Sequence, residues 1–326
     1  MKYGYASVFS PEMDNYVKLL AEAGRNINKT RNLLRRFDQY LLEKQWNQKI
    51  LPAQLISDWL NPQNIRVSTK SFNISVFKGF VKYLRSIDIS ANCPERPKAH
   101  SNYVAYIFSD DELTRIFSLA DNYEDGKRFT HRAFTFPILL RILYGCGLRA
   151  GEACSLKWSD VNLDQGVITV RYAKNQKQRF VPMSASLTNI LRDYRKMVRR
   201  EKICVDYLFE SKFNPGTPTQ VKSFYDWFSV ILQKAGVEYT KSDPNERGPC
   251  PHCLRHTFVM KSFLKSEDEG RRFEDTAPFL AAYLGHDGPR YTEAYLSSNH
   301  SLYIQSHQRV NAVIGNLFPE VCFDEE

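Results

Sequence analysis

Residues 251–256, Pro-His-Cys-Leu-Arg-His, carry side chains that are suited to phosphoryl chemistry. His252 and Arg255 stand three positions apart, so a helix through this segment places them on one face. The pair combines a proton donor that titrates near neutral pH with a permanent cation. A phosphoryl-transfer site uses such groups because negative charge builds on the non-bridging oxygens in the transition state.

Two cysteines in the same segment suggest an alternative interpretation as a zinc or redox site. A structural zinc site has four ligands, whereas Cys250, Cys253 and His256 supply three at most and no second knuckle follows them. The chain has seven cysteines, an odd number for a disulfide framework. We therefore expect these cysteines to be packing residues around His252 and Arg255, and we expect no metal ion or other cofactor.

Arginine and glutamate occur together in a second segment, Gly-Cys-Gly-Leu-Arg-Ala-Gly-Glu, at residues 145–152. Arg149 follows a glycine pair and precedes a predicted helix, where an arginine can join backbone amides in binding an anion. Glu152 lies one helical turn further on and can pair with it. Taken by itself, this segment is more typical of an ordinary surface ion pair.

Two later segments add a lysine, a histidine and two tyrosines. Lys174 ends the first strand of a predicted hairpin, a position also typical of a solvated turn lysine. His286 follows a glycine, and Tyr291 and Tyr295 occupy the helix predicted after it. A tyrosine hydroxyl can act as a covalent nucleophile, and nearby arginines favour its ionised form because its ordinary pKa is about 10.

Each segment is weak evidence alone, but their order along the chain is specific. GLRAGE, the hairpin AKNQKQRFVP, PHCLRHTF and LGHDGPRYTEAY together resemble the tyrosine recombinase (phage integrase) family over about residues 107–300. The resemblance implies a site-specific DNA recombinase that cuts and rejoins strands through a 3′-phosphotyrosine intermediate, without a metal ion or ATP.

The resemblance also implies a role for each residue. Arg149, His252 and Arg255 bind the scissile phosphate, with Glu152 orienting Arg149 from behind. Lys174 protonates the departing 5′ oxygen, and His286 contacts a non-bridging oxygen. Tyr295 is the nucleophile, because the family places it about nine residues after the Gly-His histidine and within a Thr-x-x-Tyr string; Tyr291 is then a packing residue.

The elements that position these residues divide the chain into two domains, as its 326 residues favour. Amphipathic helices are predicted at 14–24, 28–46, 52–60 and 67–87, forming a helical core-binding domain over 1–89. Residues 90–106 are interpreted as a linker. A catalytic domain over 107–326 is mainly α with a small β-hairpin or sheet (α+β). Its predicted elements are a helix with a capping box from Ser109 to Glu112, a core helix at 132–147, a hairpin within 160–183, and helices at 184–202, 218–235, 252–266, 276–284, 290–298 and 301–317.

Charge is concentrated in the first domain and favours a nucleic-acid partner. Residues 1–100 hold sixteen Lys and Arg against eight Asp and Glu, out of a net charge of +9 for the chain. Arg66, Lys70 and Lys78 are candidate phosphate contacts. No apolar run of about eighteen residues suggests a membrane span, and the N-terminus is unlike a secretory signal. We expect a cytoplasmic, nucleoid-associated protein in a prokaryotic or mobile-element context.

The family further implies assembly on double-stranded DNA recombination sites. Four strands must be cut, so the expected form is a tetramer, with residues 301–318 as the amphipathic helix exchanged between subunits and with accessory DNA-bending or directionality proteins as further partners. Two alternatives share the fold: a type IB topoisomerase-like enzyme that relaxes DNA, and a DNA-binding regulator that has lost the chemistry. The strings Gly-Leu-Arg-x-Gly-Glu and Leu-Gly-His favour the recombinase over the topoisomerase, and the presence of every expected catalytic residue disfavours the regulator.

Overall fold

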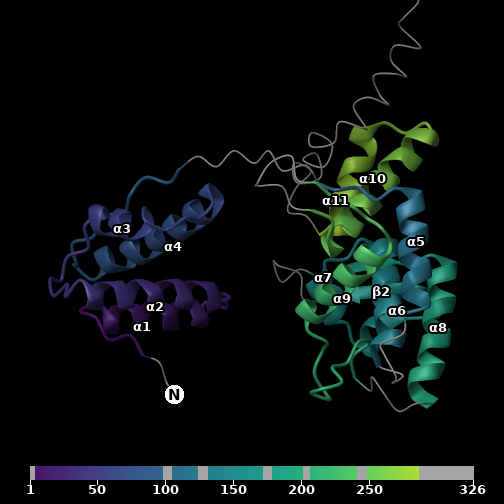
Figure 1. The fold of residues 1–326 in the computed structure, drawn as a ribbon, viewed down its shortest axis with the longest axis horizontal. Coiled ribbons are helices and arrows are strands. Elements are labelled where there is room, and N and C mark those ends of the chain that lie inside the picture. Colours follow the sequence, from purple (N-terminus) through teal and green to yellow (C-terminus); the bar gives the residue numbers. More distant parts are fainter. Residues whose placement is uncertain are drawn as a thin grey trace, which may run out of the picture. The chain divides into compact units, whose positions relative to one another are not determined.

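The computed structural model describes residues 4–97, 105–123, 131–171, 178–200, 206–240 and 248–285, without the side chains of His131 and Phe273. The chain separates into two compact units, Met1–Ser101 and Asn102–Glu326 (Figure 1). Among the helices of these residues, none has the length and apolar content that a membrane crossing needs.

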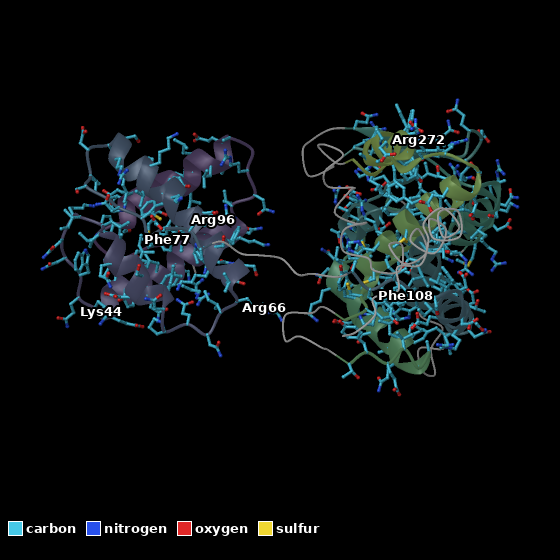
Figure 2. All side chains as sticks on the ribbon, turned by 90° about the horizontal axis from the view of Figure 1, so that it is seen from above. Lys44, Arg66, Phe77, Arg96, Phe108 and Arg272 are labelled. Carbon is cyan, nitrogen blue, oxygen red and sulfur yellow. The ribbon has the colours of Figure 1, made fainter. Side chains whose placement is uncertain are left out.

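The first unit consists of four helices around an aromatic core. Helix α4 places Ile74, Phe77, Val81 and Leu84 on one buried stripe, as the helical period requires. Phe77 lies at the centre of the unit, 4.9 Å from Phe37 between ring centroids and edge-on to it (Figure 2). The bounds confirm the predicted helices: α1 is Ser10–Glu22, α2 Asn28–Glu43, α3 Ala53–Leu60 and α4 Val67–Ser86.

The start of the predicted linker packs against this unit. Ala91 is 3% exposed and belongs to the helical core. Its neighbours hold Leu51 in a short parallel bridge, in which the Leu51 amide donates to Ser90 O (2.9 Å) and the Asn92 amide donates to Leu51 O (2.8 Å). Residues 90–92 of the interpreted linker thus pack against the helical unit, because small and polar residues without periodicity can still form backbone hydrogen bonds to a folded unit.

The second unit is mainly helical and contains one small sheet. Helix α6 packs against α5, α8 and α10 and lies at the middle of the core (Figure 1). The capping box predicted at the start of α5 is present, since the Ser109 side chain accepts from the Glu112 amide and the Glu112 side chain accepts from the Ser109 amide. The helices are α5 Asp110–Asp121, α6 His131–Cys146, α7 Ala150–Cys154, α8 Ala185–Arg200, α9 Val221–Lys234, α10 Pro251–Asp268 and α11 Phe273–Leu284, with a short 3-10 turn at Trp158–Asp160.

The sheet has three antiparallel strands in the order β1-β2-β3. Strand β1 is Val161–Asn162, β2 is Val167–Val170 and β3 is Arg179–Pro182. The β2–β3 pair is the predicted hairpin, with Ile168 opposite Val181 and Val170 opposite Arg179. The short strand β1 was not predicted, because a two-residue strand shows too little alternation of polar and apolar residues to be detected.

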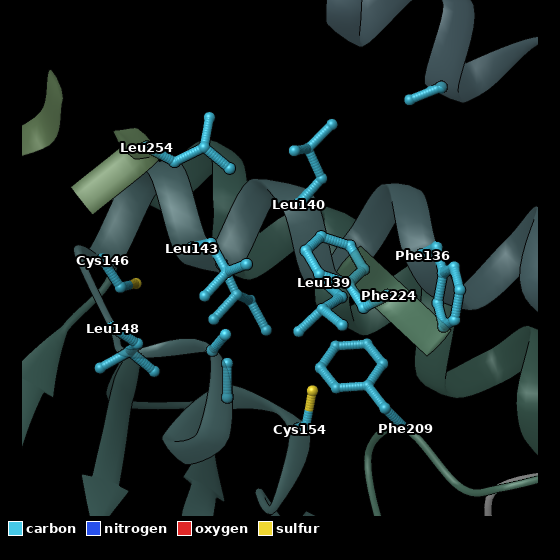
Figure 3. Packing of buried hydrophobic residues seen from close by; sticks show 14 of the residues in the cluster. Phe136, Leu139, Leu140, Leu143, Cys146, Leu148, Cys154, Phe209, Phe224 and Leu254 are labelled. Atoms are coloured by element: carbon cyan, nitrogen blue, oxygen red, sulfur yellow. The ribbon is translucent and has the colours of Figure 1, made fainter. Parts of the chain in front are cut away.

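Side chains from α6 fill the centre of the second core. Figure 3 shows Leu139, Leu143 and Cys146 on α6 facing Cys154 and Phe209 from other segments. Each of these five side chains is at most 1% exposed. This packing fixes the end of α6, and the chain that leaves α6 carries Arg149.

Candidate active site

A left-handed turn places Arg149 at the start of a helix. Gly147 follows the last residue of α6 with φ +58°, a conformation that glycine adopts without a steric cost. Leu148 is then buried in the core, and Arg149 stands at the N-cap of α7. A Cβ at residue 147 would lie 2.5 Å from Cδ1 of Phe258 on α10, so the turn is also pressed closely against that helix.

Glu152 holds Arg149 from within the protein. One carboxylate oxygen accepts from the Arg149 backbone amide at 3.0 Å and the other from Arg149 Nη1 at 2.9 Å. The Glu152 side chain is 5% exposed and that of Arg149 29%. The expected pair is present, but it is a buried carboxylate fixing a half-exposed arginine and not a surface pair.

Arg179 is a second arginine that binds Glu152, and it is not among the site residues predicted from the sequence. Its Nη2 lies 2.7 Å from Glu152 Oε2 and its Nη1 lies 3.2 Å from Oε1. Burial acts to raise the pKa of Glu152, but the hydrogen bonds and charge of Arg179, together with the hydrogen bonds of Arg149, outweigh burial and hold the pKa below its ordinary value. The carboxylate is therefore charged at neutral pH.

The first turns of α10 carry His252 and Arg255, as predicted. Arg255 is 1% exposed, the largest fully buried side chain among the described residues. Its Nη1 donates to Gly147 O at 2.7 Å and its Nη2 to Leu284 O at 3.0 Å. Arg255 therefore ties the turn before Arg149 to the last turn of α11. The sequence carried no signal for this burial.

His256 lies behind these two residues. Its ring meets the His252 ring edge-on at a centroid distance of 4.7 Å. Burial first, and then the charges of His252 and Arg255, lower the pKa of His256 from 6.5 to about 3. His256 is therefore a neutral residue of the site wall.

The cysteine pair flanks this wall. Cys250 is the N-cap of α10, Cys253 is buried, and their sulfur atoms are 3.6 Å apart. Both cysteines are thiols and are not joined in a disulfide. A hydrogen bond with Cys250, followed by burial, raises the pKa of the Cys253 thiol. Within the part of the chain that the structure describes, three or more metal-ligating side chains do not gather at this or any other point.

The other predicted residues are distributed as follows. Lys174, His286, Tyr291 and Tyr295 lie outside the described residues, as do the helices expected at 290–298 and 301–317. In the first unit, Arg66 and Lys78 are exposed, while Lys70 is half-buried and donates to Asn61 Oδ1 at 2.8 Å.

The described geometry provides a cationic wall built from three segments that are distant in sequence. The turn after α6, the start of α10 and the end of α11 meet there, joined by Arg255 and by the contacts of Arg179. Arg149 is the partly exposed cation of this wall and is fixed by a charged carboxylate. Arg149, which Glu152 already holds in place, can bind a phosphate at this wall.

Comparison with known proteins identifies relatives along most of the chain. Residues 107–301 match the model of the phage integrase family. A protein of Sinorhizobium fredii named as the integrase/recombinase y4rB is 27% identical over 319 residues, which cover 93% of this chain and 97% of that protein. Tyrosine recombinase XerA of Pyrococcus horikoshii is 26% identical over 271 residues, covering 82% of this chain and 83% of the relative.

Solved structures with a similar fold include two protein–DNA complexes. XerH site-specific recombinase bound to palindromic difH substrate has a TM-score of 0.62 at 19% identity, covering 82% of this chain and 75% of the other. The lambda integrase tetramer bound to a Holliday junction has a TM-score of 0.59 at 16% identity, covering 87% of this chain and 76% of the other. These matches agree with the mainly helical fold.

Proposed function

The chain belongs to the phage integrase family and is a DNA strand transferase, and from this premise we propose that it recombines specific DNA sites through a phosphotyrosine at Tyr295. The observation that carries the proposal is that Arg255 is hydrogen-bonded to the turn that positions Arg149. Arg255 donates to the turn before Arg149 and to the end of α11. Both arginines therefore belong to one wall, and His286 and Tyr295 follow the end of α11 in the sequence.

Arg149, Arg255 and His252 bind the scissile phosphate in this proposal. Arg149 is fixed by Glu152 and 29% exposed, which suits a direct contact with DNA. Arg255 is 1% exposed, so its contact with the phosphate requires that DNA binding open the site. His252 stands near the N-terminus of α10, where the helix dipole favours a negative ligand.

The strand-transfer step follows from the residue types and the resemblance. The Tyr295 oxygen attacks phosphorus and passes its proton to His252. The bond from phosphorus to the 5′ oxygen breaks, and that oxygen takes a proton from Lys174. His286 donates to a non-bridging oxygen. The product is a 3′-phosphotyrosine, and a 5′ hydroxyl of the partner duplex reverses the step. The bond energy is retained throughout, so the proposal needs neither ATP nor a metal ion.

DNA binding is shared between the two units in this proposal. Residues 1–89 act as a core-binding domain, with Arg66, Lys70 and Lys78 contacting phosphates, and residues 107–326 act as the catalytic domain. Relatives are solved on DNA, one of them as a tetramer on a Holliday junction. We extend that assembly to this chain, with residues 301–318 joining subunits, and we place it in the cytoplasm, where prokaryotic DNA lies.

A nicked duplex tests the proposal. The duplex carries the site that the full chain selects from a random-sequence library, with a nick just beyond the scissile bond so that the cut fragment diffuses away. Wild-type protein should become covalently attached to DNA, the Tyr295→Phe variant should not, and the Tyr291→Phe variant should react normally. No adduct from folded, DNA-bound wild type would contradict the proposal and favour a binding regulator. Relaxation of a plasmid that lacks the selected site would favour a topoisomerase.

A further inference from the structure

Arg179 is a buried cation on the inner face of the sheet. It is the first residue of β3, where side chains alternate between the two faces, so Arg179 and Val181 point inward while Phe180 is 65% exposed. Only 9% of the Arg179 side chain is exposed. Burying a guanidinium is costly unless its donors are paired. Its contacts therefore indicate what it does.

Those contacts reach two elements of the active site at once. Two nitrogens of Arg179 bind the two oxygens of Glu152, at 2.7 and 3.2 Å, and Nε donates to Tyr283 O at 2.9 Å. The guanidinium is also packed on Gly285, which caps α11 with φ +67°. A Cβ added to Gly285 would lie 3.0 Å from Arg179 Nη1.

Both partners of Arg179, Glu152 and the Tyr283 carbonyl, are close to proposed catalytic residues, in contact or in sequence. Glu152 accepts from Arg149 Nη1 at 2.9 Å, so the carboxylate that Arg179 holds is the one that orients Arg149. The Tyr283 carbonyl is in the last turn of α11, three residues before His286. Lys174 comes five residues before Arg179 in the sequence, within the segment predicted as a hairpin.

We propose that Arg179 is a positioning residue of the strand-transfer site, which fixes the Arg149 guanidinium through Glu152 and holds the end of α11 from which the chain continues to His286. This role rests on the proposed function. It differs from a purely structural role, in which Arg179 only neutralises Glu152. It also differs from a role in placing Lys174 on the hairpin.

Neutral substitutions separate positioning from fold stability. The Arg179→Gln variant should form the covalent adduct about 10- to 100-fold more slowly, the usual effect of losing a group that orients a contact residue, with DNA affinity changed less than about twofold. The Arg179→Lys variant should form the adduct little faster than Arg179→Gln, because one ammonium group cannot bind both carboxylate oxygens and a carbonyl. Arg115→Gln is the matched control. It removes a bond from Arg115 Nε to Ala235 O (2.8 Å) between α5 and the end of α9, elements without site residues, and it should cleave normally.

The double variant Arg179→Gln, Glu152→Gln covers the case in which the single variant unfolds. It removes both charges of the buried pair, so its melting temperature should recover toward wild type. Cleavage should remain slow, and no slower than in the worse single variant, because Arg179 reaches Arg149 through Glu152 and the two losses are not additive. Recovery of wild-type cleavage together with the melting temperature would overturn the positioning role.

A thiol leaving group separates Arg179 from Lys174. A substrate with sulfur in place of the 5′ bridging oxygen needs no general acid, because a thiolate leaves unprotonated. With this substrate, the Lys174→Ala variant should form the adduct at the wild-type rate, and the Arg179→Gln variant should remain slow. A wild-type rate for Arg179→Gln would overturn the proposal. Adduct from wild type and Arg179→Gln at equal rates would overturn the role of Arg179 alone. No adduct from wild type on either substrate would overturn the proposed function and this role with it.

Discussion

At the scale of single residues, burial separates two arginines that look equivalent in sequence. Arg255 is 1% exposed and donates to two main-chain carbonyls, whereas the Arg149 side chain is 29% exposed. The Arg255→Ala variant should therefore be destabilised as well as inactive. Losing both donors leaves buried carbonyls unpaired, at a cost of about 1–3 kcal/mol each.

The conservative change Arg255→Lys is therefore the better test of that position. It retains the charge, and we expect a folded protein whose adduct formation is slowed at least about 100-fold, because an ammonium cannot replace the planar fork toward two carbonyls and a phosphate. Thermal melts and single-turnover cleavage measure the two effects. Cleavage within about threefold of wild type would contradict a role in phosphate binding.

The cysteines should behave in the opposite way. Cys250→Ser and Cys253→Ser should leave the cleavage rate within about twofold, and Cys253→Ser should lower the free energy of unfolding by about 1–3 kcal/mol, because it buries a hydroxyl in place of a thiol. Urea titration and the nicked-duplex assay provide the comparison. Loss of cleavage in a stable serine variant, or stoichiometric zinc in purified protein, would contradict the packing role.

His256 makes the stability of the second unit depend on pH. The folded pKa is about 3 and the ordinary value 6.5, so between these values the unfolded chain takes up a proton that the folded chain, with His252 and Arg255 near the ring, excludes. The free energy of unfolding should therefore fall with decreasing pH from about 6.5, by up to about 1.4 kcal/mol per unit. The His256→Gln variant should lose this slope in urea titrations between pH 4 and 7; an identical slope would contradict it.

At the scale of elements, the turn between α6 and α7 decides where Arg149 stands. Gly147→Ala places a Cβ 2.5 Å from Phe258 in a backbone with φ +58°. We expect destabilisation of about 2 kcal/mol or more and slower cleavage, since Arg149 moves with the turn. The control Gly151→Ala meets no atom within 4 Å and should be tolerated. Equal melting temperatures for the two variants would contradict this account.

The elements were more predictable than their contacts. The regular spacing of apolar residues predicts helices such as α4, and the capping box at Ser109 is a local sequence pattern. Arg179 has no such signal, because its partners lie 27 and 104 residues away. The only hint was the alternation in Arg-Phe-Val-Pro, which places arginine and valine on one face. Long-range pairing of this kind depends on tertiary packing that a local pattern does not encode.

At the scale of the whole molecule, the basic first unit should account for much of the salt dependence of DNA binding. Lys78→Gln, Lys70→Gln and Arg66→Gln should each reduce the slope of log affinity against log salt by about 0.9, the contribution of one phosphate contact. Lys18→Gln, on the exposed face of α1, is the matched control and should change the slope little. Equal slopes for all four variants would contradict the assignment of these contacts.

The central claim is that Tyr295 carries the DNA during strand transfer. The most direct measurement traps wild-type protein on the nicked duplex, digests protein and DNA, and locates the nucleotide by mass spectrometry. The account predicts one modified peptide, with a 3′-phosphate ester on Tyr295 and none on Tyr291. A nucleotide on Tyr291 or another side chain, or a 5′-phosphate linkage, would contradict it.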